Sequence, residues 1–513
     1  MNATDVLLDP WCRGAHAARP AIVWRDRIVT FGELAESVLR AAQVFAELGL
    51  EADGRVVFLM EDTPSLAASY LGAMKAGGVA VAVNPRLGPD ELLAVLEDSR
   101  PSVVVADGDG AVSYERVRPR LAREARAVLR GEDLDCPTAS HRDAGALPAR
   151  TPRDMAFWVY TSGTTGRIKA AIHRHRDVLP SDLYLREVLG VGPDDRLFAT
   201  SKLFFAYALG TILFGTLKIG ATAILHDGRS DPELVAAILV RHEPSIVFSV
   251  PTLYRAMLAS GVAATEPFRA VKHYVSAGER LPASLFERWR AETGGEILDG
   301  MGTSETIYML LSNRPGRICP GASGTPAPGV EARLESGTGP ADSPGTSGVL
   351  EVRTLACADG YWQRPEESAR AFRGEWFSTG DLYRIDEGGY WHHQGRADDR
   401  FKVRGQWVSP SEVEEIVMAE DGILDAALVG IADPDGLTEG VLYLVPREER
   451  GPVDVTRLSE VLAGRLPPHK RPQRIEIVAA IPRTATGKIQ RFKLRRGITG
   501  AAADTIASCA RAT

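Results

Sequence analysis

The sequence predicts an α/β protein with largely parallel sheets, a smaller antiparallel β unit and a separate C-terminal domain. Short apolar runs of strand length alternate with helical segments from residue 56 onward, which is typical of βαβ units. The composition changes to Gly, Pro and Ser around residues 321–348, and a different pattern of elements begins near residue 400. These three observations define the fold class.

Each predicted element rests on a local signal. Thr30 is a candidate capping residue for a helix over 30–45, since a Ser or Thr hydroxyl accepts from the first free backbone N–H groups of a helix. Apolar runs bounded by Gly, Pro or Asn indicate buried strands. Residues 108–150 carry too weak a pattern to assign. The sequence predicts strands at 56–60, 79–83, 102–107, 155–160, 197–200, 221–225 and 245–250, and helices at 65–75 and from Pro89 onward.

The change of pattern near residue 400 divides the chain into a large domain, 1–397, and a small one, 398–513. Alternating β segments such as 349–353 indicate the smaller, more antiparallel unit within the first domain. The second domain begins with a strand-like segment and an acidic helix, followed by a further strand and a basic tail. Its predicted elements are 401–404, 411–416 and 425–429.

The composition excludes several classes of protein. The 513 residues are 25% charged and 44% hydrophobic, as in an ordinary soluble globular protein. A formal charge of −7 gives no support for nucleic acid or an anionic membrane as main partner. The five cysteines are scattered, which argues against a disulfide framework or a zinc site. The N-terminus lacks a signal-peptide pattern, so we expect a cytoplasmic protein.

A glycine-rich stretch follows the predicted strand 155–160. It contains two glycines and four hydroxyl side chains, followed by one cation on each side of Ile168, Arg167 and Lys169. Glycines allow close backbone approach, and N–H groups, hydroxyls and cations all favour phosphate oxygens. The spacing is not that of a Walker loop, which needs Gly-Lys-Ser/Thr. Taken alone, the stretch fits a polyphosphate site or a simple surface loop equally well.

Four later motifs decide between these interpretations. With the glycine-rich stretch, the chain resembles the adenylate-forming superfamily of acyl- and aryl-CoA ligases, peptide-synthetase adenylation domains and luciferases, over residues 20–496. Segments 202–210 and 298–316 resemble the benzoate-CoA ligase branch. The resemblance implies two mostly parallel α/β sheets and a mobile α+β C-terminal domain. It also implies ATP, Mg²⁺ and coenzyme A, with an acyl-adenylate formed first and a thioester second.

The resemblance implies a role for each matching residue. Catalytic roles fall to Lys488 and Ser304, and to Glu305 as the Mg²⁺ ligand; Asp398 matches the hinge. Asp381 matches the carboxylate that accepts both ribose hydroxyls, with Arg396 nearby. Lys402 and Gly405 lie where the second state forms its pantetheine tunnel. The other nucleotide-binding positions are Thr161, Ser162, Gly163, Thr164, Thr165, Gly166, Lys169, Ser276, Ala277, Gly278, Asp299, Gly300, Met301, Gly302 and Thr303.

The position of the acid pocket is also implied by the resemblance. Aromatic side chains and glycines form a flat slot suited to a ring, and tyrosine hydroxyls could bond a ring substituent. The same aromatics would also fit an ordinary core. The pocket residues are Phe205, Ala206, Tyr207, Gly300, Gly302, Ile307 and Tyr308.

The chain departs from the family pattern at several positions. Tyr308 stands where benzoate-CoA ligases commonly have His, which favours a substituted benzoate over benzoate. Ile168 and Ala170 stand where Pro and Gly are usual around Lys169. The segment 401–407 carries an extra cation and a Trp.

Several alternatives stay open from the sequence alone. The first is a stand-alone adenylating enzyme that loads an acyl carrier protein, and the second passes the activated acid to another acceptor. A non-catalytic nucleotide sensor is a third, although Lys488, Glu305, Asp381 and Arg396 are all present. The sequence does not distinguish a monomer from a homodimer.

Overall fold

The computed structural model describes residues 1–135, 147–162, 168–337, 339–433, 436–447, 451–483 and 489–496. These residues form two compact units. The first holds Met1–Thr161, Ile168–Ala332 and Val352–Ser378; the second holds Ser162, Arg333–Glu351 and the described residues from Thr379 onward. The predicted division at 397/398 stays a prediction, because compactness alone does not locate a hinge.

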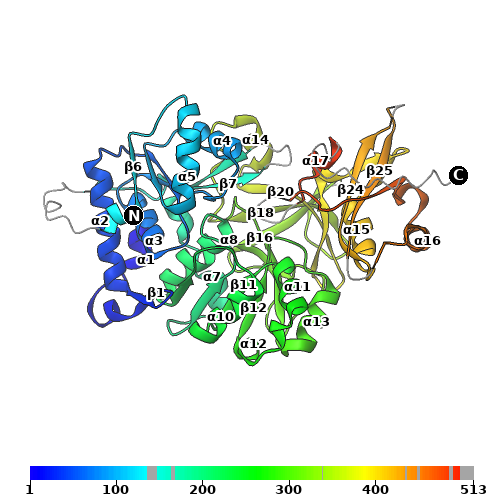
Figure 1. Cartoon of the computed structure of the whole chain (residues 1–513), viewed down its shortest axis with the longest axis horizontal. Helices are drawn as coiled ribbons and strands as arrows, with labels where there is room; N and C mark the ends of the chain where they lie inside the picture. Colours follow the sequence, from blue (N-terminus) through cyan, green and yellow to red (C-terminus); the bar gives the residue numbers. More distant parts are fainter. Residues whose placement is uncertain are drawn as a thin grey trace. The chain divides into compact units, whose positions relative to one another are not determined.

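A nine-stranded sheet forms the larger part of the first unit (Figure 1). Its central strands pair in parallel, whereas β2, β14 and β15 pair antiparallel at the two ends. The strands, in spatial order, are β15 (Thr325–Pro326), β14 (Met309–Ser312), β13 (Ile297–Gly302), β12 (His273–Ser276), β11 (Ile246–Ser249), β9 (Arg196–Ala199), β10 (Thr222–Leu225), β1 (Pro20–Trp24) and β2 (Arg27–Thr30).

A six-stranded sheet forms the other half of the first unit. Its pairs β6–β5, β5–β3, β3–β4 and β4–β7 are parallel, as the alternation of strands and helices predicts. In spatial order the strands are β6 (Ala127–Leu129), β5 (Val103–Ala106), β3 (Arg55–Leu59), β4 (Val79–Ala82), β7 (Met155–Ser162) and β8 (Ile168–Arg174). The glycine-rich stretch therefore lies between β7 and the edge strand β8.

Helices α2 (Phe31–Glu47) and α3 (Pro64–Lys75) share one apolar core with strands of both sheets. Thr30 caps α2 and forms a capping box with Glu33, as predicted. Helices α10, α11 and α13 pack on the other face of the nine-stranded sheet, and α4 and α5 on that of the six-stranded sheet. Their bounds are α4 (Pro89–Ser99), α5 (Gly108–Val117), α10 (Pro232–His242), α11 (Pro251–Ser260) and α13 (Ala283–Thr293).

Shorter helices complete the first unit. The sequence left 108–150 unassigned, yet α5 and β6 form there; two glycines in the first turn of α5 weaken its helical pattern. The remaining helices are α1 (Ala3–Leu8), α6 (Gly131–Asp135), α7 (Leu183–Glu187), α8 (Ala206–Ala208), the π-helix η5 (Leu209–Gly215), α9 (Thr216–Ile219), α12 (Glu266–Ala270) and α14 (Pro365–Ala371).

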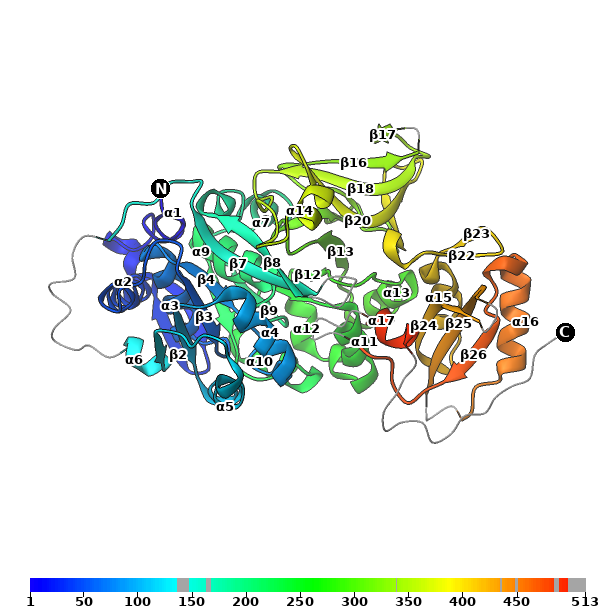
Figure 2. The same ribbon diagram turned by 90° about the horizontal axis from the view of Figure 1, so that it is seen from above.

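The predicted smaller β unit is a six-stranded sheet in which β16, β18 and β20 lie side by side (Figure 2). The pairs β16–β17, β19–β20 and β20–β21 are antiparallel, as expected. The strands are β16 (Val330–Ser336), β17 (Gly339–Ala341), β18 (Ser347–Thr354), β19 (Phe372–Arg373), β20 (Trp376–Ile385) and β21 (Trp391–Arg396).

The C-terminal part of the second unit is a small α+β structure, as predicted. Strand β25 pairs antiparallel with β24 and parallel with β26, and helices α15 and α16 pack on this sheet. No helix within the described ranges is long and apolar enough to cross a bilayer. The elements are β22 (Phe401–Val403), β23 (Gln406–Val408), α15 (Pro410–Met418), β24 (Ile423–Ala432), β25 (Thr438–Pro446), α16 (Val455–Arg465), β26 (Arg474–Ile477) and α17 (Arg491–Arg495).

Candidate active site

Strand β8 carries Lys169 at the edge of the six-stranded sheet. The Lys169 ammonium lies 3.6 Å from the centroid of the Tyr361 ring and 4.0 Å from Glu305 Oε1. The two departures from the family pattern have a packing explanation, because Ala170 is fully buried and Ile168 packs beside it in the core around Trp158. Thr161 and Ser162 end β7, while Gly163, Thr164, Thr165 and Gly166 lie outside the described residues.

The Glu305 carboxylate is buried and held at both its side chain and its backbone. The Tyr361 hydroxyl donates to Oε1 at 2.6 Å, and the Ala358 N–H donates to the Glu305 carbonyl at 2.7 Å. The segment 358–362 itself pairs with β8, since the Trp362 N–H donates to the carbonyl of Ala170 at 3.0 Å. The same segment therefore orients both the ammonium and the carboxylate.

The carboxyl ends of the parallel strands β12 and β13 bring the predicted adenine-edge residues together. Ser276 and Asp299 are paired in register, and Gly278 follows with φ +88°. Asp299 is buried, and burial raises its pKa to about 8. Ligands of open α/β sheets bind outside the carboxyl ends of the strands, which is where Ser276, Ala277 and Asp299 lie.

Gly300 and Gly302 lie against the neighbouring chain. A Cβ at Gly300 would lie 2.6 Å from the Leu311 carbonyl, and one at Gly302 would lie 2.8 Å from the Tyr308 carbonyl. These glycines let β13 approach β14 closely. Met301 and Thr303 flank Gly302, and the Thr303 hydroxyl lies 3.1 Å from that of Thr306.

The predicted aromatic loop follows β9 and is fixed at its start by buried polar groups. The Asp62 carboxylate accepts from the Leu203 N–H at 3.0 and 3.1 Å, and the Lys202 ammonium donates to the His226 carbonyl at 2.6 Å. Burial raises the pKa of Asp62 to about 7 and lowers that of Lys202. These contacts link the loop to the segments that follow β3 and β10.

The ring of Tyr207 is oriented by its hydroxyl, which donates to the carbonyl of Val275 at 3.2 Å. Phe205 precedes the short helix α8, which begins at the buried Ala206. The Tyr207 hydroxyl hydrogen is thus already used, so the oxygen can serve a ligand only as an acceptor.

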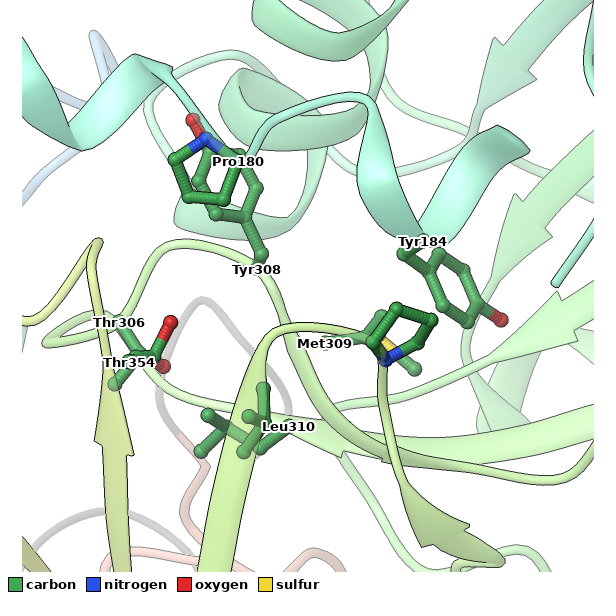
Figure 3. A pocket seen from close by; sticks show the side chains of 9 residues that line it. Pro180, Tyr184, Thr306, Tyr308, Met309, Leu310 and Thr354 are labelled. Atoms are coloured by element: carbon green, nitrogen blue, oxygen red, sulfur yellow. The ribbon is translucent and has the colours of Figure 1, made fainter. Parts of the chain in front are cut away.

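Ile307 and Tyr308 follow Glu305 in an unusual conformation. Ile307 is buried with φ +60°, a strained value for a β-branched residue. Tyr308 packs against Gly210, where a Cβ would lie 3.0 Å from the tyrosine ring. Burial raises the pKa of Tyr308. Figure 3 shows that Tyr308 also lines a small pocket with Pro180 and other side chains, namely Tyr184, Thr306, Met309, Leu310 and Thr354.

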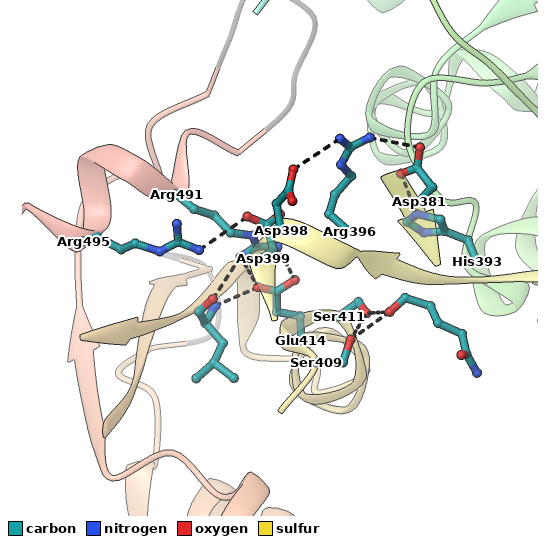
Figure 4. A network of polar contacts seen from close by, with 12 residues as sticks. Asp381, His393, Arg396, Asp398, Asp399, Ser409, Ser411, Glu414, Arg491 and Arg495 are labelled. Atoms are coloured by element: carbon teal, nitrogen blue, oxygen red, sulfur yellow. Dashed lines mark hydrogen bonds and ion pairs between the residues drawn. The ribbon is translucent and has the colours of Figure 1, made fainter. Parts of the chain in front are cut away.

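The second unit contains a separate polar cluster around Asp381 (Figure 4). Arg396 Nη1 donates to Asp381 Oδ2 at 3.1 Å and to the Thr379 carbonyl at 2.8 Å. His393 Nε2 lies 3.2 Å from Asp381 Oδ1. Arg396 lies between Asp381 and the exposed Asp398, with Nη2 4.0 Å from Asp398 Oδ2. The predicted ribose carboxylate, its arginine and the hinge residue are therefore neighbours.

The remaining predicted residues lie in the C-terminal part of that unit. Lys402 is exposed on β22, with its ammonium 4.8 Å from the centroid of the Trp407 ring, and Gly405 has φ +80° in the turn of the hairpin. Lys488 lies outside the described residues. Arg491, three residues later, forms ion pairs with Glu414 and Asp399 (Figure 4).

Family models cover most of the chain. The model described as "AMP-binding enzyme" matches residues 9–362, and that of the "AMP-binding enzyme C-terminal domain" matches residues 412–488. The chain belongs to the AMP-binding enzyme family. This confirms the resemblance to adenylate-forming enzymes.

Individual members of the AMP-binding enzyme family match over nearly the whole length. The chain is 43% identical over 505 residues to a 3-hydroxybenzoate–CoA ligase of an Aromatoleum strain, with 96% of both chains covered. It is 38% identical to a 3-hydroxybenzoate–CoA/4-hydroxybenzoate–CoA ligase of Thauera aromatica, with 96% of this chain and 97% of the relative covered. The crystal structure of a benzoate CoA ligase from Burkholderia xenovorans has a TM-score of 0.84 at 34% identity, with 96% of this chain and 100% of that chain covered.

Sequence reasoning missed three polar side chains of this AMP-binding enzyme. Tyr361 contacts Glu305, His393 contacts Asp381, and His173 Nε2 lies 2.8 Å from the carbonyl of Ser304. His173 had a local signal, since it follows Lys169 by four residues on the same strand. Tyr361 had none, because its contact joins segments far apart in the sequence.

Proposed function

We propose that this chain is an AMP-forming aryl acid–CoA ligase that activates a hydroxybenzoate or another benzoate with a polar substituent. The observation that carries the proposal is 43% identity over the full length to a 3-hydroxybenzoate–CoA ligase. The arrangement of Lys169, Glu305 and Tyr361 supplies the charge and the hydrogen bonds that such a reaction needs.

In the first half-reaction the acid carboxylate attacks the α-phosphate of ATP, and pyrophosphate leaves. We assign Thr161 to Gly166 and Lys169 to the phosphates, and the Ser304 hydroxyl to the α-phosphate. The carboxylate of Glu305 fits Mg²⁺, a hard cation that prefers carboxylate and phosphate oxygens. Bound there, Mg²⁺ would offset negative charge on the phosphates.

The nucleoside contacts are assigned from the family motif. Ser276, Ala277, Gly278 and Asp299 are assigned to the adenine edge, with Gly300, Met301, Gly302 and Thr303 following on the same strand and turn. Asp381 is assigned to both ribose hydroxyls, since a carboxylate accepts two hydrogen bonds at once. Arg396, already oriented by Asp381 and Thr379, is assigned to the ribose or a phosphate.

In the second half-reaction the thiol of coenzyme A attacks the acyl carbon, and AMP leaves. We assign Lys488 to stabilising charge during adenylate formation. Asp398 is assigned to the hinge at which the C-terminal domain rotates between the two half-reactions, so its role is mechanical. Gly405 and Lys402 are assigned to the path of the pantetheine arm, where a side chain at Gly405 would obstruct the thiol.

The acid pocket is assigned to Phe205, Ala206, Tyr207, Ile307 and Tyr308. The Tyr207 hydroxyl donates its hydrogen to the Val275 carbonyl. Its oxygen can still accept a hydrogen bond from a ligand. A phenolic hydroxyl on the substrate ring could donate to it. This supports a hydroxybenzoate over benzoate itself.

The test is release of pyrophosphate with ATP and Mg²⁺ across benzoate, the three hydroxybenzoates, aminobenzoates, cinnamates and fatty acids, each with and without coenzyme A. We expect a hydroxybenzoate to react fastest, with a strong increase on adding coenzyme A and an aryl-CoA product identified by mass. If adenylate forms but the rate does not change when coenzyme A is added, the acceptor is instead a carrier protein or another molecule. A preference for fatty acids would overturn the assigned pocket.

A further inference from the structure

We infer that His173 and Asp177 form a positioning pair that sets the Ser304–Glu305 segment relative to Lys169 for adenylate formation. This inference rests on the proposed function, since it concerns the same site. All five residues belong to the first unit. Neither His173 nor Asp177 is assigned to a substrate contact.

The His173 ring is fully buried and makes one polar contact from each nitrogen. Nε2 lies 2.8 Å from the carbonyl of Ser304, and Nδ1 lies 3.0 Å from Asp177 Oδ2. A carbonyl oxygen only accepts hydrogen bonds, so Nε2 carries a proton and donates it. The ring therefore holds the backbone of the residue directly before Glu305.

The orientation of this ring is itself fixed. The fully buried Asp177 also accepts from the Arg174 N–H at 3.1 Å, and Arg176 Nε lies 3.6 Å from its other oxygen. The Phe157 ring stacks on His173 with centroids 4.8 Å apart and planes 6° apart. The carboxylate prevents the ring from flipping, and the stacked ring prevents it from tilting. The arrangement parallels the carboxylate–histidine pairs that orient metal ligands.

Strand geometry explains why this histidine can cooperate with Lys169. Side chains of a strand alternate between its faces, so residues 169 and 173 of β8 project from the same face. One reaches the Glu305 carboxylate and the other reaches the neighbouring Ser304 backbone. Strand β8 thus contacts the Ser304–Glu305 segment at two points, one on its side chain and one on its backbone.

Stability alone does not account for a polar pair at this depth. Replacing both partners of a buried hydrogen bond by apolar groups of the same shape can be nearly neutral for stability, and the surrounding core is apolar. The pair does determine where the Ser304 carbonyl lies. A shift of about 1 Å at a reacting centre can lower a rate about 100-fold, so holding this segment is valuable for adenylate formation.

Two substitutions separate the two nitrogens of the ring. In His173→Gln the amide nitrogen reaches the place of Nε2 and can still donate to the Ser304 carbonyl. In His173→Asn the amide reaches only the place of Nδ1, so the contact to Asp177 is kept and that to Ser304 is lost. Both remove the stacked ring, so they share the packing defect.

The experiment measures single-turnover formation of aryl-adenylate and equilibrium binding of ATP with and without Mg²⁺, together with the melting temperature. We expect His173→Asn to slow adenylate formation about 10- to 100-fold with an unchanged KM for the acid, and His173→Gln to stay within about threefold of the parent. We also expect Mg²⁺ to strengthen ATP binding in His173→Gln as in the parent, and less in His173→Asn.

Equal behaviour of the two folded variants in both measurements would overturn the positioning role, as would losses that simply follow the melting temperature. A parent protein that adenylates no aromatic acid would instead overturn the proposed function. In that case the Mg²⁺-dependent ATP binding of the two variants still tests the pair. Asp177→Asn keeps the shape of the side chain but replaces the carboxyl group that orients the His173 ring. We expect it to slow adenylate formation, as His173→Asn does, but by a smaller factor.

Discussion

The ammonium of Lys169 lies 4.0 Å from the carboxylate of Glu305. Lys169 lies on β8 of the six-stranded sheet, and Glu305 lies in the connection between β13 and β14 of the nine-stranded sheet. Tyr361 contacts both, placing its ring under the ammonium and its hydroxyl on the carboxylate. Cation–π attraction and a hydrogen bond to a charged acceptor each fix one partner. The geometry of the two charged groups is therefore set by a residue that itself carries no charge.

The first prediction concerns Tyr361→Phe. It removes the hydroxyl that donates to Glu305 at 2.6 Å and keeps the ring beside Lys169. A hydrogen bond to a charged group contributes about 1.5–3 kcal/mol. We expect kcat/KM for Mg²⁺–ATP in the first half-reaction to fall about 10-fold or more, with little change in the KM of the acid. Exchange of labelled pyrophosphate into ATP measures this.

Tyr361→Leu is the matched control, because it removes the ring as well as the hydroxyl. It should lose more activity than Tyr361→Phe if the cation–π contact also orients Lys169. Parent-like ATP kinetics in Tyr361→Phe would contradict a role for the hydroxyl.

The second prediction concerns Asp381→Asn in the second unit. The change removes the charge that pairs with Arg396 at 3.1 Å and the acceptor assigned to the ribose hydroxyls. We expect the KM for ATP to rise about 10- to 100-fold, the equivalent of about 1.5–3 kcal/mol. Comparing ATP with its 2′-deoxy and 3′-deoxy forms gives the sharper measurement.

The parent should discriminate against both deoxynucleotides, and Asp381→Asn should lose most of that discrimination. Asp386→Asn is the control. Asp386 is another carboxylate of the second unit, 2.6 Å from His392 Nε2 and with no role assigned to it in nucleotide binding. Full discrimination retained in Asp381→Asn would contradict the ribose assignment.

Local signals predicted most of the fold, and long-range contacts explain what they missed. The apolar run at 79–83 forms β4, and Thr30 forms the predicted capping box, because both depend on neighbouring residues. The contact of Tyr361 with Glu305 depends on the pairing of 358–362 with β8, which no local pattern encodes. The same holds for His393 beside Asp381, which is set by the register of β20 and β21. The family motif thus pointed to Glu305 and Asp381, whereas Tyr361 and His393, which contact them, had no such signal.

The third prediction concerns Lys488→Ala, which rests on the motif alone because Lys488 lies outside the described residues. We expect adenylate formation to fall at least 100-fold, as when a charge-stabilising group is removed. Transfer from supplied aryl-adenylate to coenzyme A should be retained, since Lys488 is assigned only to the first half-reaction. Lys493→Ala, at an exposed position on α17, should leave both rates unchanged. Equal loss of both half-reactions in Lys488→Ala would contradict the assignment.

The fourth prediction concerns pH and the buried His175. The Ala3 N–H donates to His175 Nδ1 at 3.0 Å, so this nitrogen must stay unprotonated to hold α1. Burial, with a contribution from Arg150, lowers the pKa of His175 from 6.5 to about 4. Between these values the unfolded chain binds a proton that the folded chain does not. The stability is therefore complete above pH 6.5 and falls as the pH drops toward 4.

The shift corresponds to at most about 3.5 kcal/mol, at about 1.4 kcal/mol for each pH unit. In His175→Asn the amide oxygen can accept from Ala3 and does not titrate. We expect the urea midpoint of this variant to fall less than that of the parent between pH 7 and pH 4. His226, whose pKa burial lowers to about 3, contributes equally to both proteins and cancels in the comparison. Identical pH profiles for the parent and His175→Asn would show that His175 does not couple protonation to the docking of α1.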